Sequence, residues 1–223
     1  MNKIIYFTRH AQAEHNVAED YTIPDAPLTK LGREQSANLR KETENDFQKE
    51  ADLLVTSPLR RPMQTLIIGY GPLRSRLESE GKPVIILPEL QEVNALPCDT
   101  GSSPSSLSSN PEFAGLDFSS LQDDWTSKQG IYDPERVQER ARWVRRWLRE
   151  RKEERIVVVA HGDILRCITD GYRSDTPWAN AEVRAYRFVS PDDDQAKVVL
   201  VKEEAKEGTE EPTSGEIAEE QGK

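Results

Sequence analysis

The sequence predicts an α/β fold of three layers, in which a mainly parallel central sheet carries helices on both faces. Two observations predict it: short apolar runs recur along the chain, and helical patterns lie between them. Each run is bounded by polar residues, as expected of a strand that is buried on both faces. The strand-like runs are KIIYFT (3–8), DLLVT (52–56), PVIIL (83–87) and RIVVVA (155–160).

The segment between the first two runs predicts a helix over residues 27–44, PLTKLGREQSANLRKETE. Thr29 is the expected N-cap, because its hydroxyl can accept a hydrogen bond from a free backbone N–H of the first turn. Leu31, Ala37 and Leu39 are the residues that we expect to point toward the core.

A second helix is predicted over residues 134–151, PERVQERARWVRRWLRER. Pro134 suits the first helical position, where the missing N–H of proline costs nothing. Apolar residues then recur at helical spacing on one face. They are Val137, Ala141, Val144 and Leu148.

Between residues 95 and 130 neither pattern is sustained, and Ser, Pro and Gly are abundant. A structureless loop of this length is uncommon in a compact domain, so we predict an insertion with short local helices. We expect it to lie beside the functional site whose residues are described below. A disordered surface loop is the alternative. Residues 181–189 and 196–202, on either side of the turn signal SPDDD, predict a closing pair of strands.

The charge distribution predicts one folded domain, residues 1–202, followed by an acidic tail, residues 203–223. The net charge is −10, and residues 203–223 carry −6 of it, with eight glutamates against two lysines. The tail has too little apolar surface to order itself. The acidic body argues against nucleic-acid binding, although a local positive pocket can still hold a small phosphorylated ligand.

Other features of the composition limit the cellular setting. Cys98 and Cys167 give neither a disulfide framework nor metal spacing. The apolar start is too short for a signal peptide, and no run approaches the ~18 apolar residues of a membrane span. We expect a cytoplasmic protein that binds no membrane, with the nucleus left open as a second compartment and secretion without a signal as the weaker alternative.

The chain has three histidines, and each lies at or shortly after the end of a strand-like run. His10 and His15 belong to RHAQAEHN after the first run, and His161 follows RIVVVA. Ligands bind outside the carboxyl ends of the strands in open α/β sheets, so we expect these side chains to meet. A metal site is not expected, because HxxxH and CxxC pairs are absent and neighbouring arginines would repel a cation.

Two further stretches lead to the same edge of the sheet. VTSPLRRPMQT (55–65) supplies adjacent arginines, and Arg9 with Arg60 or Arg61 would make a positive hole that suits a phosphoryl group. LQEVNALPCDTG (90–101) supplies carboxyl groups. A carboxyl group beside an anion hole is well placed to give a proton to a leaving oxygen.

These four stretches, in this order, resemble the motifs of the histidine phosphatase superfamily, the phosphoglycerate-mutase-like proteins. The family's Arg-His-Gly is matched by Arg9-His10-Ala11, and its Ser-Pro-Leu-x-Arg-Ala-x-Gln-Thr by SPLRRPMQT (57–65), which makes Arg61 the pocket arginine. Its Leu-x-Glu is matched at Glu92 and its strand–His-Gly at His161. The resemblance spans about residues 3–190. The RHAQxxHN opening and the PCDTGSS stretch are most similar to small fungal and plant members.

The resemblance implies a metal-independent phosphatase that hydrolyses a small phosphorylated metabolite and uses no cofactor. His10 would be the nucleophile and become a phosphohistidine. Arg9, Arg61 and His161 would surround the phosphoryl oxygens. Glu92 would protonate the leaving oxygen and then, as a carboxylate, activate water. A phosphomutase with the same intermediate and a catalytically silent phosphate-recognising scaffold are the alternatives, and the oligomeric state is left open.

Three more residues are candidates for substrate contact. Asn16 could add a neutral hydrogen bond from the loop of the nucleophile. His15 could touch the substrate, orient a neighbour or cap a turn. Asp99 is the rival of Glu92 for the acid role, or it could instead hold His15 or a turn.

Two departures from the family pattern affect residues close to the site. Ala11 stands in place of the usual glycine and is small enough to let a phosphoryl group approach. Pro62 replaces an alanine, and we expect it to be accepted if it falls in the first turn of its helix. Neither departure removes a group that the chemistry needs.

Overall fold

A computed structural model describes residues 3–201, and the predicted acidic tail lies outside the described residues. Its centre is a six-stranded sheet in the order β3-β2-β4-β1-β5-β6. The first four strands of that order run parallel, whereas β5 pairs antiparallel with β1, and β6 pairs antiparallel with β5. The strands are β1 (Ile4–Arg9), β2 (Leu53–Thr56), β3 (Ile85–Ile86), β4 (Arg155–Ala160), β5 (Val183–Phe188) and β6 (Val198–Leu200).

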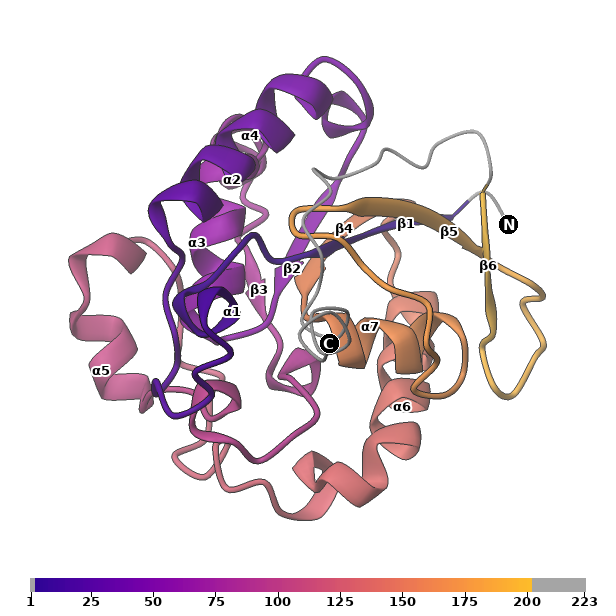
Figure 1. Cartoon of the computed structure of the whole chain (residues 1–223). Helices are drawn as coiled ribbons and strands as arrows, with labels where there is room; N and C mark the ends of the chain where they lie inside the picture. The colour runs from indigo at the N-terminus through magenta and orange to yellow at the C-terminus, as the bar shows by residue number, and fades with distance from the viewer. Residues whose placement is uncertain (1–2, 202–223) are drawn as a thin grey trace, which may run out of the picture.

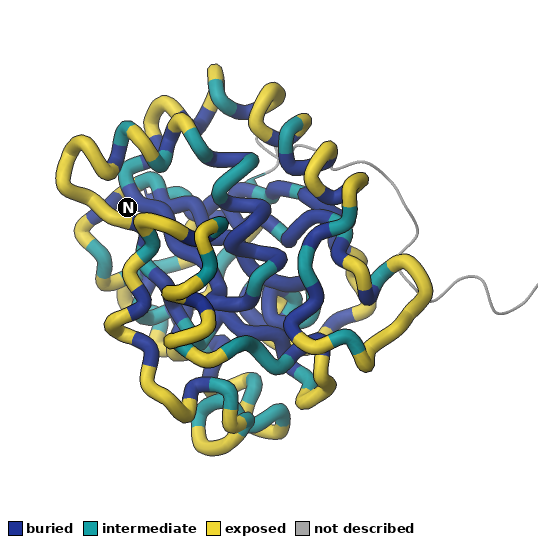
Figure 2. Tube along the Cα trace, turned by 90° about the vertical axis from the view of Figure 1, so that its left-hand side faces the viewer, coloured by how far each residue is buried: buried dark blue, intermediate teal, exposed yellow. Residues whose placement is uncertain are grey.

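The predicted α/β class and the three-layer arrangement are confirmed (Figure 1). One apolar cluster packs α2, α3 and α4 on one face of the sheet, and a second packs α6 and α7 on the other. Strand residues alternate between these clusters, so the centre of the molecule is buried on both sides (Figure 2). The longer helices are α2 (Lys30–Thr43), α3 (Arg60–Gly69), α4 (Gly71–Ser79), α6 (Val137–Glu150) and α7 (Gly162–Thr169).

The register of the central strands brings the predicted histidines together. In the parallel β1–β4 pair, Arg9 lies opposite Ala160. The next residues along the two strands, His10 and His161, therefore leave the same edge of the sheet side by side. The His10 N–H also donates to the Ala160 carbonyl at 2.9 Å, which extends the pairing by one residue.

Helix α2 begins as predicted but buries a different face. The Thr29 hydroxyl accepts the Gly32 N–H at 2.9 Å, and Leu39 is buried. The prediction for Leu31 is wrong, because its side chain is 37% exposed. The helix instead turns Gly32, Gln35 and Ser36 inward, since the absence of a side chain at residue 32 lets the helix approach the main chain of Gln12.

Helix α6 carries the predicted apolar face, with Ala141, Val144 and Leu148 buried and Val137 partly buried against the same cluster. Pro134 opens a 3₁₀ turn, Pro134–Arg136, that leads directly into the α-helix. The predicted closing strands are β5 and β6, which pair antiparallel.

The segment between residues 95 and 130 packs against the first apolar cluster. It contains α5 (Pro104–Ser109) and the 3₁₀ turns Pro97–Asp99 and Pro111–Phe113. Five of its apolar side chains are buried there: Leu107, Phe113, Phe118, Leu121 and Trp125. Within residues 3–201, no helix is both long enough and apolar enough to cross a membrane.

Candidate active site

The three histidines gather at the carboxyl ends of β1 and β4. The ring centroids of His10 and His161 are 5.1 Å apart, and those of His10 and His15 are 6.1 Å apart. All three side chains are buried. The structure therefore places together imidazoles that lie 151 positions apart in the sequence.

The contacts of His10 fix the position of its proton. Nδ1 lies 2.7 Å from the Ala11 carbonyl, which can only accept, so Nδ1 carries the hydrogen. The Arg61 Nε–H donates to Nε2 at 3.1 Å, so Nε2 presents a lone pair. Burial, with the charges of Arg61 and Arg9, holds the His10 pKa well below its ordinary value. The ring is neutral and nucleophilic at Nε2.

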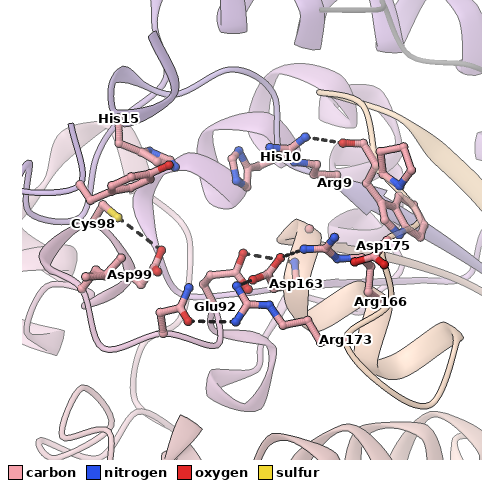
Figure 3. Close-up of a pocket in the computed structure, with 16 residues that line it drawn as sticks. Arg9, His10, His15, Glu92, Cys98, Asp99, Asp163, Arg166, Arg173 and Asp175 are labelled. Carbon is pink, nitrogen blue, oxygen red and sulfur yellow. Dashed lines mark hydrogen bonds and ion pairs between the residues drawn. The ribbon is translucent and has the colours of Figure 1, made fainter. Parts of the chain in front are cut away.

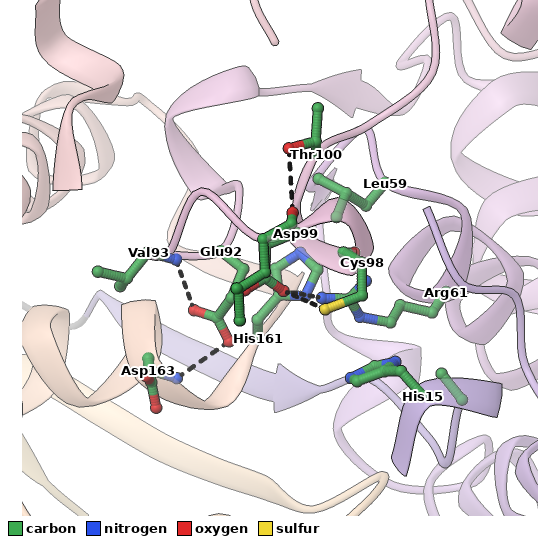
Figure 4. Close-up of polar contacts among 12 residues, drawn as sticks. His15, Leu59, Arg61, Glu92, Val93, Cys98, Asp99, Thr100, His161 and Asp163 are labelled. Atoms are coloured by element: carbon green, nitrogen blue, oxygen red, sulfur yellow. Dashed lines mark hydrogen bonds and ion pairs between the residues drawn. The ribbon is translucent and has the colours of Figure 1, made fainter. Parts of the chain in front are cut away.

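Arg61 connects His10 to the 95–130 segment. Its Nη1 donates to the Cys98 carbonyl at 2.6 Å, and its Nη2 pairs with Asp99 Oδ1 at 3.0 Å (Figure 4). The side chain is 1% exposed. It leaves the first turn of α3, where Pro62 follows it without removing a needed N–H, as expected.

The start of α3 is held by Asp25, a residue that the sequence did not single out. Its carboxylate accepts the Arg60 N–H at 2.9 Å at the first helical position. The same carboxylate accepts the N–H and the hydroxyl of Ser102, at 3.1 and 2.7 Å. Asp25 thus joins the N-terminal loop, the helix that carries Arg61 and the 95–130 segment, and it is itself buried.

Arg9 lies beside His10 at the end of β1. Its Nη1 donates to the Trp178 carbonyl, and its buried Nε has no hydrogen-bond partner among the described residues. Burial lowers the Arg9 pKa to about 10, and the nearby charge of Arg61 contributes. A guanidinium with a buried unpartnered N–H beside the histidines is ready to bind an anion.

His161 follows β4 and precedes α7. Its Nε2 lies 2.9 Å from the Ser57 hydroxyl, and its buried Nδ1 has no hydrogen-bond partner in the described part of the chain. Burial first, then the charge of Arg61, keeps the His161 pKa well below its ordinary value. Ser57 belongs to the SPLRRPMQT motif, so the motif itself was a signal for this contact.

Glu92 occupies the opposite side of the site, at the N-terminus of α7. Its Oε1 accepts the N–H groups of Val93 and Ile164, at 2.9 and 3.1 Å, and its Oε2 accepts the Asp163 N–H at 3.4 Å (Figure 4). Burial raises the pKa of Glu92 to about 7, with further increases from Asp163 and Asp99. The carboxyl group can therefore both give and take a proton near neutral pH.

His15 and Asn16 form a local unit on α1 (Glu14–Val17). Asn16 uses its Oδ1 to accept the Ala13 N–H at 2.9 Å and its Nδ2 to approach His15 Nε2 at 3.1 Å. His15 lines the cavity described below, whereas Asn16 is not among the lining residues. Burial and the two arginines lower the His15 pKa to about 3, so this ring is neutral as well.

A cavity of about 350 Å³ opens over these groups (Figure 3). Arg9, His10, His15, Glu92 and Asp99 line its floor and sides, while Arg61 and His161 lie behind them. The remaining lining residues form the outer wall: Tyr21, Asn94, Leu96, Cys98, Gly162, Asp163, Arg166, Arg173, Asp175, Pro177 and Trp178.

The outer wall has a charged side that sequence reasoning missed. Asp163 pairs with both Arg166 and Arg173, and Arg173 also donates to Asn94 at 3.3 Å (Figure 3). Asp163 follows the His161-Gly162 pair directly and could have been noted. Arg173 lies in an irregular segment, where no pattern points to the site.

No group of three or more His, Cys, Asp or Glu residues within 3–201 is arranged to hold a metal ion. The positive charge of the site comes instead from Arg9 and Arg61. Metal independence stays a prediction.

Comparison with known proteins gives one family. Residues 5–201 match the model of the histidine phosphatase superfamily (branch 1). A probable phosphatase of Schizosaccharomyces pombe is 29% identical over 172 residues, which cover 74% of this chain and 77% of that protein. Phosphoglycerate mutase-like protein 1 of Arabidopsis thaliana is 30% identical over 199 residues, covering 73% and 69% of the two chains.

Solved structures share the fold at lower identity. A phosphoserine phosphatase mutant from Entamoeba histolytica, in complex with phosphoserine, superposes with a TM-score of 0.55 at 16% identity. The match covers 89% of this chain and 95% of that one. The predicted likeness to fungal and plant members is confirmed.

Proposed function

The chain belongs to the histidine phosphatase superfamily, branch 1, and from that premise we propose that it is a phosphatase that hydrolyses a small phosphorylated metabolite through a phosphohistidine, without a metal. One observation carries the proposal. A neutral imidazole, His10, lines the cavity beside Arg9 and a carboxyl group with a pKa of about 7, and its Nε2 accepts an N–H from Arg61, which lies just behind the cavity lining.

In the first step the phosphoryl group lies among Arg9, Arg61 and His161. The Arg61 N–H that now donates to His10 Nε2 passes to a phosphoryl oxygen, which frees the lone pair. Nε2 then attacks phosphorus and the bond to the leaving oxygen breaks, while Glu92 gives that oxygen its proton. The two guanidinium groups stabilise the charge that builds up on the phosphoryl oxygens.

In the second step the Glu92 carboxylate takes a proton from water. The water oxygen attacks phosphorus, the phosphorus–nitrogen bond breaks and its electron pair returns to His10 Nε2. Inorganic phosphate leaves, and Glu92 is again protonated. The pKa of about 7 supports both roles, because neither protonation state is strongly disfavoured at neutral pH.

The contacts of the two candidate acids favour Glu92 over Asp99. The Asp99 carboxylate forms an ion pair with Arg61 at 3.0 Å and accepts a hydrogen bond from the Cys98 thiol. It therefore holds the Arg61 guanidinium. Glu92 faces the cavity from the side opposite the arginine pair and accepts backbone N–H groups alone. In this proposal Asp99 orients Arg61, His15 forms part of the wall beside the nucleophile, and Asn16 holds His15.

The wall beyond Glu92 suggests the kind of leaving group. Asn94, Asp163, Arg166 and Arg173 offer donors and acceptors of both signs on that side of the cavity. Such a wall suits a leaving alcohol that carries several hydrogen-bonding groups better than an apolar one. The physiological substrate is therefore proposed to be a polar metabolite with a single reacting phosphate.

The test is phosphate release from sugar phosphates, phosphoglycerates, nucleotides and an aryl phosphate, with EDTA present. Wild-type release that survives EDTA and is lost in His10→Ala would support the phosphohistidine route. The adjacent arginines supply a matched pair: Arg61→Gln should lower kcat/KM by roughly 10²–10³, and Arg60→Gln by no more than a few-fold.

Other outcomes would change the assignment. Release that persists in His10→Ala would refute the proposed nucleophile. Little net release of phosphate, together with phosphoryl transfer that a bisphosphate stimulates, would identify a mutase. The Arabidopsis relatives are named as phosphoglycerate mutase-like proteins. Absence of both reactions would favour the scaffold.

A further inference from the structure

We propose that Lys128 and Arg140 are positioning residues for Glu92, because both cations hold its main-chain carbonyl and place positive charge beside the residue that exchanges the proton. The inference rests on the proposed function of Glu92. It assigns a part in the chemistry to the 95–130 segment, of which Lys128 is a member, and to α6, which carries Arg140.

Both cations reach the same atom. Lys128 Nζ donates to the Glu92 carbonyl at 3.1 Å, and Arg140 Nη2 approaches that carbonyl at 3.5 Å, the long end of hydrogen-bond range. Lys128 adopts a left-handed backbone conformation with φ of 56°, which is unfavourable for a lysine. The chain therefore bears a local conformational cost in the turn that delivers this ammonium group to Glu92.

Arg140 is more unusual, because it is 0% exposed and has no carboxylate partner within 4.0 Å among the described residues. Its Nε and Nη1 are buried without any hydrogen-bond partner in the same part of the chain. Such a buried cation costs stability that an apolar side chain of similar size would avoid. Because the Arg140 charge lowers stability, we infer that it has a functional role. Glu92 is the negative charge that acts most strongly on Arg140.

Several charges act on the Glu92 carboxyl group. Asp163 of α7 and Asp99 of the 95–130 segment raise its pKa, in addition to burial, and Arg61 of α3 lowers it. Arg9, Arg140 and Lys128 also interact electrostatically with Glu92 and favour its carboxylate form. Burial lowers the pKa of Lys128 to about 8, so Lys128 contributes its full charge only below that pH. Removal of Arg140 or Lys128 should therefore raise the Glu92 pKa and impair its return to the carboxylate that activates water.

The experiment compares pH profiles of kcat/KM for an alkyl phosphate and for nitrophenyl phosphate. Alkyl oxygen needs a proton to leave, so kcat/KM falls as the pH rises through the Glu92 pKa, whereas nitrophenolate leaves without one. In Arg140→Met we expect the alkaline limb for the alkyl ester to move up by about one pH unit. Lys128→Met should move it in the same direction, and Arg140→Lys should restore most of the wild-type profile.

A matched control on the same helix is Arg142→Met, which should leave the limb in place. Thermal unfolding separates a structural role from the proposed one. Arg140→Met should unfold at or above the wild-type temperature, because it removes a buried unpaired cation. A lower unfolding temperature with an unmoved limb would overturn the proposal.

A ¹³C NMR titration of the Glu92 carboxyl group tests the proposal without turnover. Its pKa should rise in Arg140→Met and in Lys128→Met, and an unchanged pKa in both would overturn the inference. Failure of the proposed function looks different: wild type would not hydrolyse nitrophenyl phosphate, or His10→Ala would hydrolyse it equally well. In that case the titration would still measure whether Lys128 and Arg140 lower the Glu92 pKa.

Discussion

At the scale of single residues, burial sets the protonation states of the site. His10, His15 and His161 all lose water and lie near arginines, so their pKa values are lowered and the rings are neutral. Glu92 loses water too, but burial of an acid has the opposite effect and raises its pKa to about 7. The same physical cause therefore favours unprotonated imidazoles on one side of the cavity and a protonated carboxyl group on the other.

A substitution at Glu92 follows from this pairing. Glu92→Gln keeps the shape of the side chain but cannot exchange a proton, so kcat/KM for an alkyl phosphate should fall by roughly 10²–10⁴. The alkaline limb near pH 7 should vanish with it, while kcat/KM for nitrophenyl phosphate should fall far less. Glu89→Gln, at a partly buried carboxyl group three residues earlier, is the control. Equal losses for both esters in Glu92→Gln would contradict an acid role.

At this scale the sequence identified residues that stand in motifs and missed those that do not. The order of motifs selected Arg61 over its neighbour Arg60, and the structure places Arg61 on His10. Asp25 and Arg173 carry no such signal, because each lies in an irregular loop and reaches the site only through tertiary contacts. Whether Asp99 holds His15 could be decided only from the side-chain positions. In the structure the Asp99 carboxylate pairs with Arg61 instead.

At the scale of elements, the approach of α2 to the loop that carries His10 depends on one glycine. A Cβ at Gly32 would lie 2.0 Å from the Gln12 carbonyl oxygen, which is far inside van der Waals contact. Thr29 N–H donates to that same carbonyl at 3.0 Å, so the start of the helix and the loop are bound at this point. The loop is the one that carries His10.

Two glycine substitutions test this contact. Gly32→Ala should lower the free energy of unfolding by about 1–3 kcal/mol, because helix or loop must move. Gly71→Ala, in α4, has nothing within 4 Å of the added Cβ and should be neutral or stabilising by about 0.5–1 kcal/mol. Urea unfolding of both variants measures the difference. Similar values for the two would show that α2 does not depend on a close approach at Gly32.

The same contact explains an error of the sequence reasoning. Apolar spacing placed Leu31 toward the core, but the helix turns small and polar residues toward the loop instead. Gln35 is buried because its side-chain oxygen accepts the Gln12 N–H at 2.9 Å. The hydrophobic pattern of a sequence cannot predict a buried helix face that is made of small and polar residues. It predicted the buried face of α6 because that face contains apolar residues.

At the scale of the whole molecule, the buried histidines make folding sensitive to acid. Their folded pKa values lie below the ordinary value near 6.5, so the unfolded chain binds more protons and stability is lost as the pH falls below about 6.5. Glu92, with a raised pKa of about 7, acts in the opposite sense between about pH 4.5 and 7. Burial also raises the pKa values of Asp25 and Glu89, which add to the effect of Glu92 as the pH approaches their ordinary range, so the three histidines set the sign nearest pH 6.

The free energy of unfolding should therefore fall between pH 6.5 and 5, with a slope that approaches roughly 2–3 kcal/mol per pH unit. Urea unfolding at pH 5.0, 6.0 and 7.0 measures it. Constant or rising stability toward pH 5 would mean that the histidines take up protons in the folded protein.

The global fold was predictable because strands and helices alternate with clear boundaries. The path of residues 95–130 was not, since Phe113, Phe118, Leu121 and Trp125 are irregularly spaced and are buried only by contact with distant elements. The shape of the cavity depends on that path, as Leu96, Cys98 and Asp99 line it. The acidic tail and the predicted domain limits stay predictions.

The bonds of Asp25 bear on how new specificities could be built into this chain. A grafted segment that follows a different path at position 102, without a serine there, would remove two of the three hydrogen bonds of the buried Asp25 carboxylate. The third bond caps the helix that carries Arg61, so the graft would disturb catalysis as well as recognition. Asp25 therefore binds the 95–130 segment, the N-terminal loop and the start of α3 to one another. A chimera that keeps these bonds would exchange all three parts together.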